Sequence, residues 1–441
     1  MGIRNTDRIR IVNSSNQQII VIGGGAAGMI AAWRAALLGA RVLLLEKNPR
    51  LGIKLLISGG GKCNITHSGT TEKLLQHFQI NESRFLKHAL YSFTNTDVIE
   101  LLHTFGVETE ERVNGKIFPA SEKAGDVVHA FRRAMEKAGV AIQLSSTVQN
   151  ILRDEQGVCG VCVQNEIIPS RHIILAAGGI SYKKTGTTGD GFTWAEHLGH
   201  TIVPLRPALA PIILSPIPPR EFQGVAIRDC TLQAIAKNKI IAEWHGDVLF
   251  THFGISGPAA LEVSKDTFIE FEKGNIVSVH VDFFSEYSVQ EVEKMIHDEI
   301  QTHGTRVILT LLEQMIPQRL APFFLSRLNI DAATKLHQLK KNERILIAQT
   351  LKQWNIGSVQ HIDIDRGEVT AGGIALHEVD ATTMRSKIVN GLYCCGEVLD
   401  IAGPVGGFNL QAAFSSGFVA GESAGKEFLQ KNQQPVTSTS F

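Results

Sequence analysis

The chain has 441 residues, which is too long for one hydrophobic core, so we expect two or three domains. Hydrophobic residues make up 44% and charged residues 20%, a composition typical of a folded globular protein rather than a disordered one. Lysine plus arginine and aspartate plus glutamate each total 43, which gives a formal net charge of zero. This balance disfavours a dedicated nucleic-acid binder, although a local basic patch could still bind RNA.

No segment predicts insertion into a membrane or export. The most apolar long run, 29–45, is interrupted by two arginines. Residues 1–17 are polar and basic without the apolar centre of a signal peptide, and we interpret them as a disordered tail. We therefore expect a cytoplasmic protein with no membrane partner and with free thiols. Cys159 and Cys162 should face opposite sides of one strand, so no metal site is predicted.

The first strongly patterned stretch begins with a strand of branched apolar residues at 19–22. Gly23, Gly25 and Gly28 follow with the spacing G-x-G-x-x-G and open a helix rich in alanine and leucine. Gly23 would permit the tight turn, Gly25 the approach of a pyrophosphate, and Gly28 the close packing of helix and strand. The pyrophosphate would then meet the free N–H groups at the N-terminus of the helix.

A second strand, 41–45, ends in Glu46. The carboxylate at this position can accept hydrogen bonds from both ribose hydroxyls of an adenosine. Because it would repel a 2′-phosphate, the pattern favours FAD or NAD over NADP.

A second glycine-rich loop, 58–64, lies in the segment LLISGGGKCN. Its consecutive glycines leave backbone N–H groups free to contact a ligand, and Lys62 could balance phosphate charge or face a flavin ring. Cys63 is either a small buried spacer or a thiol close to a bound flavin, and the first interpretation is favoured on general grounds.

The next part of the chain alternates helical and strand patterns. Helices are predicted over 72–78, 83–92, 95–105 and 126–138, and strands over 141–144, 148–153, 158–163 and 167–169. We expect these four strands to form a small antiparallel layer. A strand from His172, ending in Gly178 and Gly179, would return the chain to the parallel sheet and admit a ligand at its edge. Asp190 then caps a helix and, as an alternative, contacts the cofactor.

The character of the sequence changes near residue 200. Residues 201–285 are rich in proline and in alternating segments, which predicts a β-rich insert, and 286–355 carry helical periodicity, which predicts a helical insert. Inside the β-rich part, His252 stands beside an aromatic residue and ahead of a predicted helix start. It is our candidate proton donor, although a single histidine is more often structural.

The chain closes with glycine-rich strands over 356–430, followed by a tail, 431–441. A strand at 391–395 leads into Gly396 and Glu397, where an acid can hold a ribityl hydroxyl. A helix N-terminus behind Phe408 can face the electron-rich edge of a flavin. This closing unit favours FAD over NAD, and the absence of a second G-x-G-x-x-G argues against a separate nicotinamide domain.

These residues resemble a known family, the flavoproteins with two dinucleotide-binding folds called BaiN-like, YhiN-like or aminoacetone-oxidase-like. The shared motifs, in order, are GGGAAG, LGIKLLISGGGKCN, GKIFPASEKAGDVV, TGTTGDG, LFTHFGISGPAAL, VTAGGI and GLYCCGEVLDIAGPVGGFN. The resemblance implies an α/β fold, in which a Rossmann-type FAD-binding domain (18–200 and 356–430) is split by a β-barrel-like and helical insert. One departure is Ile53, where the family usually has arginine, and it leaves one phosphate or substrate contact in doubt.

Carried over position by position, the family motifs and the glycine pattern give a set of FAD-contacting residues. The cofactor-binding candidates are Gly23, Gly25, Ala26, Ala27, Gly28, Glu46, Lys47, Lys54, Ser58, Gly59, Gly60, Gly61, Lys62, Cys63, Asn64, Val148, Ala177, Gly178, Gly179, Asp190, Gly396, Glu397, Gly406, Gly407, Phe408, Asn409 and Leu410. The catalytic candidates are His252 and Cys63.

Members of this family are associated with reduction of conjugated double bonds in bile-acid-type steroids, with aminoacetone oxidation and with reduction of uridine in ribosomal RNA. We predict hydride transfer from a reduced flavin to an activated C=C bond of an enone-type small molecule or of uridine, with NAD(P)H as a candidate reductant. One alternative is an amine oxidase that uses oxygen. Another is a flavin redox sensor in which Cys63 forms a reversible adduct or disulfide.

Overall fold

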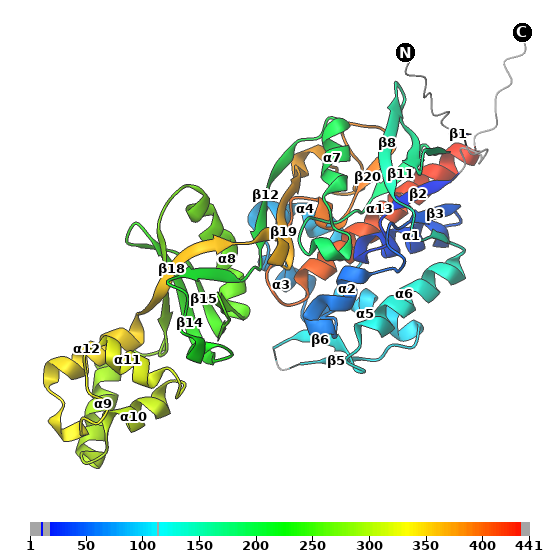
Figure 1. Ribbon diagram of the computed structural model, residues 1–441. Helices are drawn as coiled ribbons and strands as arrows, with labels where there is room; N and C mark the ends of the chain where they lie inside the picture. Colours follow the sequence, from blue (N-terminus) through cyan, green and yellow to red (C-terminus); the bar gives the residue numbers. More distant parts are fainter. Residues whose placement is uncertain (1–9, 12–17, 113, 434–441) are drawn as a thin grey trace, which may run out of the picture. The chain divides into compact units, whose positions relative to one another are not determined.

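The computed structural model describes residues 10–11, 18–112 and 114–433, and it divides into two compact units (Figure 1). Unit 1 comprises 1–205 and 369–441, and unit 2 comprises 206–368. Most of the predicted N-terminal tail lies outside the described residues, but Arg10–Ile11 form strand β1. The predicted tail from residue 431 begins too early, because the last helix continues to Gln433.

The centre of unit 1 is a five-stranded parallel sheet in the order β20-β11-β2-β3-β7. Its strands are β2 (Ile19–Ile22), β3 (Val42–Leu45), β7 (Ala141–Gln143), β11 (His172–Leu175) and β20 (Leu392–Cys394). Every residue of β2 and β11 is buried, as expected for strands covered on both faces. This is the Rossmann-type sheet that the sequence predicts.

Strand β7 corrects one prediction. The sequence pattern predicts 141–144 in the antiparallel layer, but β7 pairs in parallel with β3 at the edge of the central sheet. The reason is the connection: helix α6 (Ala124–Ala138) ends at Gly139 in a left-handed conformation, and the chain re-enters the sheet directly afterwards.

Three smaller sheets complete the strands of unit 1. The four-stranded sheet β1-β10-β9-β8 contains the predicted antiparallel layer, β4-β6-β5 forms a three-stranded sheet, and β12 pairs with β19. Their bounds are β4 (Thr66–His67), β5 (Thr109–Glu111), β6 (Lys116–Pro119), β8 (Val148–Asp154), β9 (Gly157–Val163), β10 (Glu166–Pro169), β12 (Ile202–Ala208) and β19 (Val369–Ile374).

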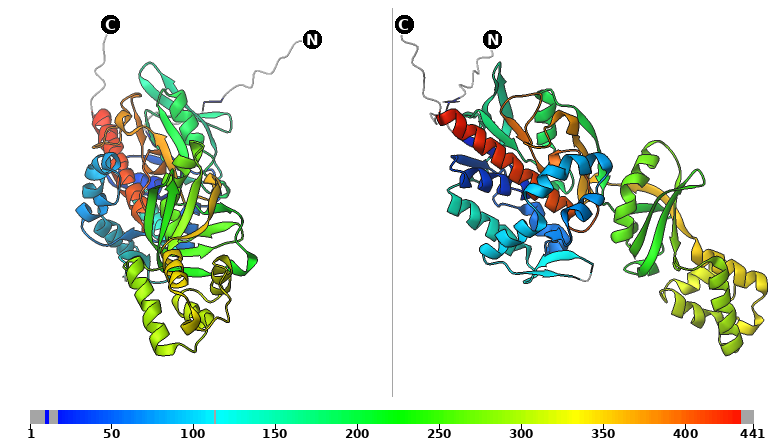
Figure 2. Two further views of the ribbon diagram at one scale, coloured as in Figure 1. Left: turned by 90° about the vertical axis from the view of Figure 1, so that its left-hand side faces the viewer. Right: turned by 180° about the vertical axis from the view of Figure 1, so that it is seen from behind.

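Helices surround the sheet, and the longest runs the length of unit 1 (Figure 2). They are α1 (Ala26–Leu37), α2 (Ile53–Ile57), α3 (Thr71–Gln76), α4 (Ile80–Ser92), α5 (Asn95–Thr104), α6, α7 (Asp190–His197) and α13 (Phe408–Gln433). Small residues let α13 lie directly on α1: a Cβ at Gly421 would come within 2.2 Å of the Ala31 carbonyl oxygen. The same closeness recurs between Gly417 and Ala27, at 2.3 Å.

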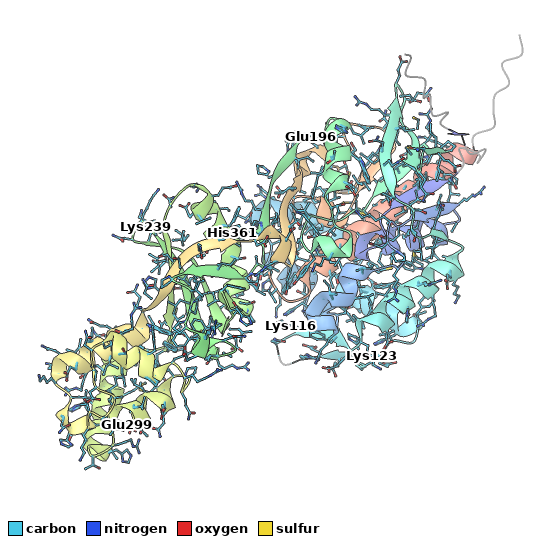
Figure 3. All side chains as sticks on the ribbon, viewed as in Figure 1. Lys116, Lys123, Glu196, Lys239, Glu299 and His361 are labelled. Carbon is cyan, nitrogen blue, oxygen red and sulfur yellow. The ribbon has the colours of Figure 1, made fainter. Side chains whose placement is uncertain are left out.

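Unit 2 contains a closed barrel of six strands in the order β13-β16-β15-β14-β17-β18. The strands are β13 (Ile212–Ser215), β14 (Ala226–Ala236), β15 (Lys239–Phe250), β16 (Gly254–Ser256), β17 (Val277–Asp282) and β18 (Trp354–Ile362). Alternate residues of β17 point inward, and Val277, Val279 and Val281 are fully buried. Lys239 and His361 instead point away from the barrel into solvent (Figure 3).

The helices of unit 2 include the predicted helical insert. They are α8 (Pro258–Glu272), α9 (Val289–His303), α10 (Ile308–Met315), α11 (Ala321–Arg327) and α12 (Lys341–Lys352). The helical part and the barrel share one hydrophobic core, in which the Trp354 ring packs against Phe250 and Phe324. The predicted boundary at 356 lies too early, because β18 is a barrel strand and unit 1 resumes only at residue 369.

Among the described helices, none combines the length and the apolar composition needed to cross a membrane.

Candidate flavin site

Of the three fingerprint glycines at the turn between β2 and α1, two are crowded and one is open. A Cβ at Gly23 would lie 2.4 Å from the Ala176 carbonyl oxygen, and a Cβ at Gly28 would lie 1.9 Å from the Gly23 carbonyl oxygen. At Gly25 a Cβ would meet nothing within 4 Å. The backbone here therefore borders open space at the N-terminus of α1, which suits the approach of a pyrophosphate.

The N-cap residue of α1 is Gly25, which has no side chain that could cap the first turn. Free N–H groups at Ala26 and Ala27 are therefore available to an anion. Ala27 is also the contact point for Gly396, where an added Cβ would lie 2.7 Å from the Ala27 Cβ. The closing segment of unit 1 thus packs onto the start of α1, next to the turn that follows β2.

Glu46 lies at the carboxyl end of β3, beside this turn. Its Oε2 accepts a hydrogen bond from Gly24 N at 2.6 Å, and its Oε1 accepts from Asn48 N at 2.8 Å and Asn48 Nδ2 at 2.7 Å. Glu46 is 7% exposed, and these donors hold its carboxylate in one orientation. Sequence reasoning found Glu46 but missed Asn48, whose only signal is an amide two residues after the acid.

Two predicted residues, Lys47 and Asp190, pair with each other. Lys47 Nζ lies 2.8 Å from Asp190 Oδ2 and 2.6 Å from Thr188 Oγ1. Burial raises the pKa of Asp190, but hydrogen bonds from Lys47 and Thr188 outweigh burial and leave that pKa below its ordinary value. Asp190 is the first helical residue of α7 rather than its cap, which is Gly189.

A second polar cluster connects the two portions of unit 1. Lys54 Nζ lies 2.7 Å from both carboxylate oxygens of Glu397. Glu397 Oε1 also accepts from Thr370 N at 2.8 Å and from Ser181 Oγ at 3.4 Å. The Ser181 and Thr370 hydroxyls are 2.7 Å apart, and Gly179 leaves room for them, since its Cβ would lie 2.3 Å from Thr370 Oγ1. Neither Ser181 nor Thr370 was predicted.

The two glycine-rich loops of the prediction also meet. In the orientation that satisfies its neighbours, the Asn64 amide donates to Thr66 O at 3.0 Å and accepts from Gly407 N at 3.0 Å. Gly407 has φ +91°, and a Cβ there would lie 2.5 Å from the Thr66 carbonyl carbon. Gly59 and Gly60 also have left-handed φ, and a Cβ at Gly60 would meet nothing within 4 Å. This loop therefore offers exposed backbone to a ligand.

Phe408, the first residue of α13, is enclosed by rings. The His67 ring is stacked on it at 4.8 Å, and the His77 ring lies 4.4 Å from it. Burial and the nearby His67 lower the pKa of His77. Asn409 fixes the turn before α13, because its Oδ1 accepts from Gly403 N at 2.8 Å and its Nδ2 donates to Gly403 O at 2.7 Å. His67 was not predicted, since it lies 341 positions from Phe408 in the sequence.

Several candidates are engaged elsewhere or buried. Lys62 forms an exposed ion pair with Glu122 at 2.8 Å, and Ser58 Oγ donates to Leu55 O at 2.8 Å. Val148 is 5% exposed at the start of β8. The remaining members of the predicted set, which lie along the strand ends and loops described above, are Ala177, Gly178, Gly61, Gly406 and Leu410.

Cys63 is fully buried, and burial raises the pKa of its thiol to about 12. A thiolate is therefore not populated at neutral pH, which argues against a reactive Cys63 and favours the buried spacer. All six cysteines are free, and the described residues contain no cluster of side chains suited to a metal ion.

His252 belongs to unit 2, so it lies outside the set of residues that unit 1 brings together. Its side chain is exposed, and its Nε2 lies 2.6 Å from Gln223 Nε2.

The profile of the HI0933-like protein Rossmann domain matches residues 17–423. The chain belongs to the HI0933-like family. A 3-dehydro-bile acid delta(4,6)-reductase from Clostridium scindens is 28% identical over 92% of this chain and 98% of its own. A ribosomal RNA dihydrouridine synthase from Escherichia coli is 30% identical over 91% of this chain and 96% of its own. The structure of Escherichia coli quinol fumarate reductase FrdA is 17% identical, covers 96% of this chain and 71% of its own, and has a TM-score of 0.50, which is a likeness of fold alone.

Membership of the HI0933-like family, together with these relatives, makes the protein a FAD-dependent oxidoreductase. The residues present fit FAD: an open glycine turn faces a helix N-terminus, a fixed carboxylate follows β3, and exposed glycine backbone lies beside a second helix N-terminus.

Proposed function

We propose that this protein reduces an activated carbon–carbon double bond, one conjugated with a carbonyl group. The observation that carries the proposal is the near full-length similarity to two relatives whose names describe this chemistry, a bile acid delta(4,6)-reductase and a dihydrouridine synthase. A steroid enone and the uracil ring differ in size and polarity, but both contain C=C conjugated with C=O. We therefore define the substrate class by this group.

We further propose that the FAD phosphates contact the turn at Gly25 and that Glu46 binds the adenosine ribose. Glu397, held by Lys54, would accept a hydrogen bond from the ribityl chain. The N-terminus of α13 at Phe408 would face the pyrimidine edge of the ring, where its positive end favours the reduced flavin. When bound and reduced, FAD supplies the hydride for the substrate carbon.

His252 is the residue that we propose for proton or hydrogen-bond donation to the substrate. Its imidazole is exposed, and an imidazole N–H is a common proton or hydrogen-bond donor in catalysis. Cys63 is not proposed as a catalytic group, because its buried thiol cannot ionise at working pH.

NAD(P)H is the proposed source of electrons. The sequence has no second dinucleotide fingerprint, so the nicotinamide would have to reach the flavin from the substrate side rather than from a domain of its own. The RNA alternative for the acceptor rests on the dihydrouridine synthase relative, while the zero net charge of this chain gives it no support.

The test is anaerobic stopped-flow absorbance of the FAD-loaded protein in two stages. In the first, the oxidised protein is mixed separately with NADH, NADPH and aminoacetone. In the second, the reduced protein is mixed with a conjugated 3-oxo steroid or with ribosomal RNA containing uridine. We expect a nicotinamide to bleach the flavin, and one conjugated acceptor to restore its colour faster than oxygen does. Bleaching by aminoacetone alone would establish an amine oxidase, and bleaching by no donor would favour a sensor.

The His252 assignment is tested with His252→Ala against His361→Ala, an exposed histidine of the same unit (Figure 3). We expect His252→Ala to bind FAD normally and to reduce the acceptor at least about 100-fold more slowly, whereas His361→Ala matches the unaltered protein. Equal rates in both variants would contradict the assignment.

A further inference from the structure

The turn between β15 and β16 presents two side chains on a fixed backbone. Thr251 N donates to Gly254 O at 2.8 Å, and Leu214 N on β13 donates to Phe253 O at 3.0 Å. The Phe253 side chain is 50% exposed and His252 is also exposed. An exposed turn held on both sides by backbone hydrogen bonds keeps its side chains in place without burying them.

A neighbouring segment holds the imidazole. Gln223 Nε2 lies 2.6 Å from His252 Nε2, and Gln223 O accepts from Arg319 Nη1 at 3.2 Å. The preceding Phe222 is buried, and its ring packs at 5.0 Å against the Phe323 ring of α11. Gln223 is therefore anchored by the helical part of unit 2, and through Gln223 that part positions His252.

The hydrogen bond selects one tautomer of the ring. With the Gln223 amide nitrogen facing the ring, as the structure places it, His252 Nε2 is the acceptor, and the proton of the neutral imidazole then lies on Nδ1. Among the described residues, no hydrogen bond involving His252 Nδ1 is found.

We propose that Gln223 is a positioning residue that holds His252 as the Nδ1–H tautomer. Nδ1–H is then the donor that His252 offers to the carbonyl oxygen conjugated with the substrate double bond. This inference rests on the proposed function and specifies how His252 serves it.

The chemistry explains why a neutral N–H donor suits this reaction. Hydride forms a C–H bond at the β-carbon, the π electrons move toward the carbonyl, and negative charge develops on its oxygen. A proton from solvent completes the reduction at the α-carbon. A fixed N–H donor stabilises the developing charge and needs no proton transfer of its own. Steroid enones and uracil both present such an oxygen.

The tautomer can be measured without turnover. Two-bond 1H–15N correlation spectra of 15N-histidine-labelled protein, taken above the pH range in which imidazole titrates, report which ring nitrogen bears the proton. The His252 signals are assigned by their absence in His252→Asn. We expect Nδ1–H in the unaltered protein, and Nε2–H in Gln223→Glu, whose carboxylate can only accept. Nε2–H in the unaltered protein would overturn the proposal.

The kinetic test separates this inference from the proposed function. We expect Gln223→Leu to bind FAD and to be reduced by the electron donor as before, but to reduce a conjugated acceptor about 10-fold more slowly. The control is Gln233→Leu, which removes a comparable side-chain hydrogen bond, to Glu243 at 2.6 Å, in the same barrel. Equal acceptor rates in Gln223→Leu and the control would overturn the positioning role. If the unaltered protein reduces no conjugated acceptor, the proposed function itself fails, and the spectra still decide the tautomer.

Discussion

The contact between α1 and α13 predicts that alanine at two neighbouring glycine positions will have opposite effects. At Gly421 a new Cβ would lie 2.2 Å from Ala31 O and 2.9 Å from Ala31 Cα. Both are backbone atoms that cannot rotate away, so the helices must separate by about 1 Å to restore normal contact. At Gly425 the nearest atom is Leu38 Cδ1 at 3.0 Å, the end of a flexible side chain.

The expected free energies follow from two opposing terms. Alanine stabilises a helix interior by about 1 kcal/mol relative to glycine at either position. Overpacking against a rigid backbone costs about 1–3 kcal/mol, and this second term applies to Gly421→Ala alone. We therefore expect Gly421→Ala to lower the free energy of unfolding by up to about 2 kcal/mol. Gly425→Ala should leave it unchanged or raise it by less than about 1 kcal/mol.

Urea unfolding of the FAD-free protein, followed by circular dichroism, measures both changes. A FAD titration then tests the functional link, because Gly417→Ala would act at Ala27, in the turn proposed for the FAD phosphates, with its Cβ 2.3 Å from Ala27 O. We expect Gly417→Ala to weaken FAD binding more than Gly421→Ala does. Equal stability of Gly421→Ala and Gly425→Ala would refute the argument from backbone contact.

Three further predictions concern buried or paired groups. Burial lowers the pKa of His172 to about 4, although the nearby Glu427 opposes this shift. The contribution of neutral His172 to the free energy of unfolding is therefore complete above the unfolded pKa of about 6.5. That contribution falls by up to about 3 kcal/mol as the pH drops to 4. His172→Leu should therefore flatten the loss of stability between pH 6.5 and 4 in urea titrations, and an unchanged slope would contradict this. Lys54→Met, by leaving Glu397 without its cation, should weaken FAD binding about tenfold in a fluorescence titration, and adding Glu397→Gln should recover part of that loss. Cys63 should resist thiol reagents in the folded protein, while the half-exposed Cys162 reacts. The variant Cys63→Ala should keep the flavin spectrum and the rate of acceptor reduction. Rapid labelling of Cys63 would contradict its burial.

The parts of the fold that the sequence predicted are those set by local patterns. The strand 19–22, its glycine turn and the helix after it follow from apolar runs and glycine spacing over fewer than 20 residues. Strand β7 was assigned to the wrong sheet, because three residues carry no information on which neighbour they pair with. The residue pattern alone predicted the barrel only as a β-rich segment, whereas the family resemblance implied a β-barrel-like insert, which the structure confirms. The last barrel strand, 354–362, was missed because it follows the helical part by a single residue.

The candidate site shows the same limit. Glu46 and Glu397 were found because each follows a strand, whereas Ser181 and Thr370 were missed because a hydroxyl has no periodic signal and its partner lies far away in the chain. Cys63 had two interpretations from sequence, and only its burial separates them. Local sequence patterns therefore identify candidate residues, and contacts between distant parts of the chain decide which of them belong to the candidate site.

These long-range contacts also explain how a split domain can form one cofactor site. The first portion of unit 1 supplies the glycine turn and the glycine-rich loop, and neither is held by its own segment alone. At the turn, Gly396 and Gly417 pack against Ala27, and at the loop Asn64 accepts from Gly407 N at 3.0 Å, so partners from the second portion hold both. Because the second portion follows unit 2 in the chain, the proposed flavin site is complete only after the chain has returned from unit 2 to unit 1. FAD binding and the folding of unit 1 should therefore be strongly coupled, since a ligand that contacts both portions stabilises only the state in which they meet.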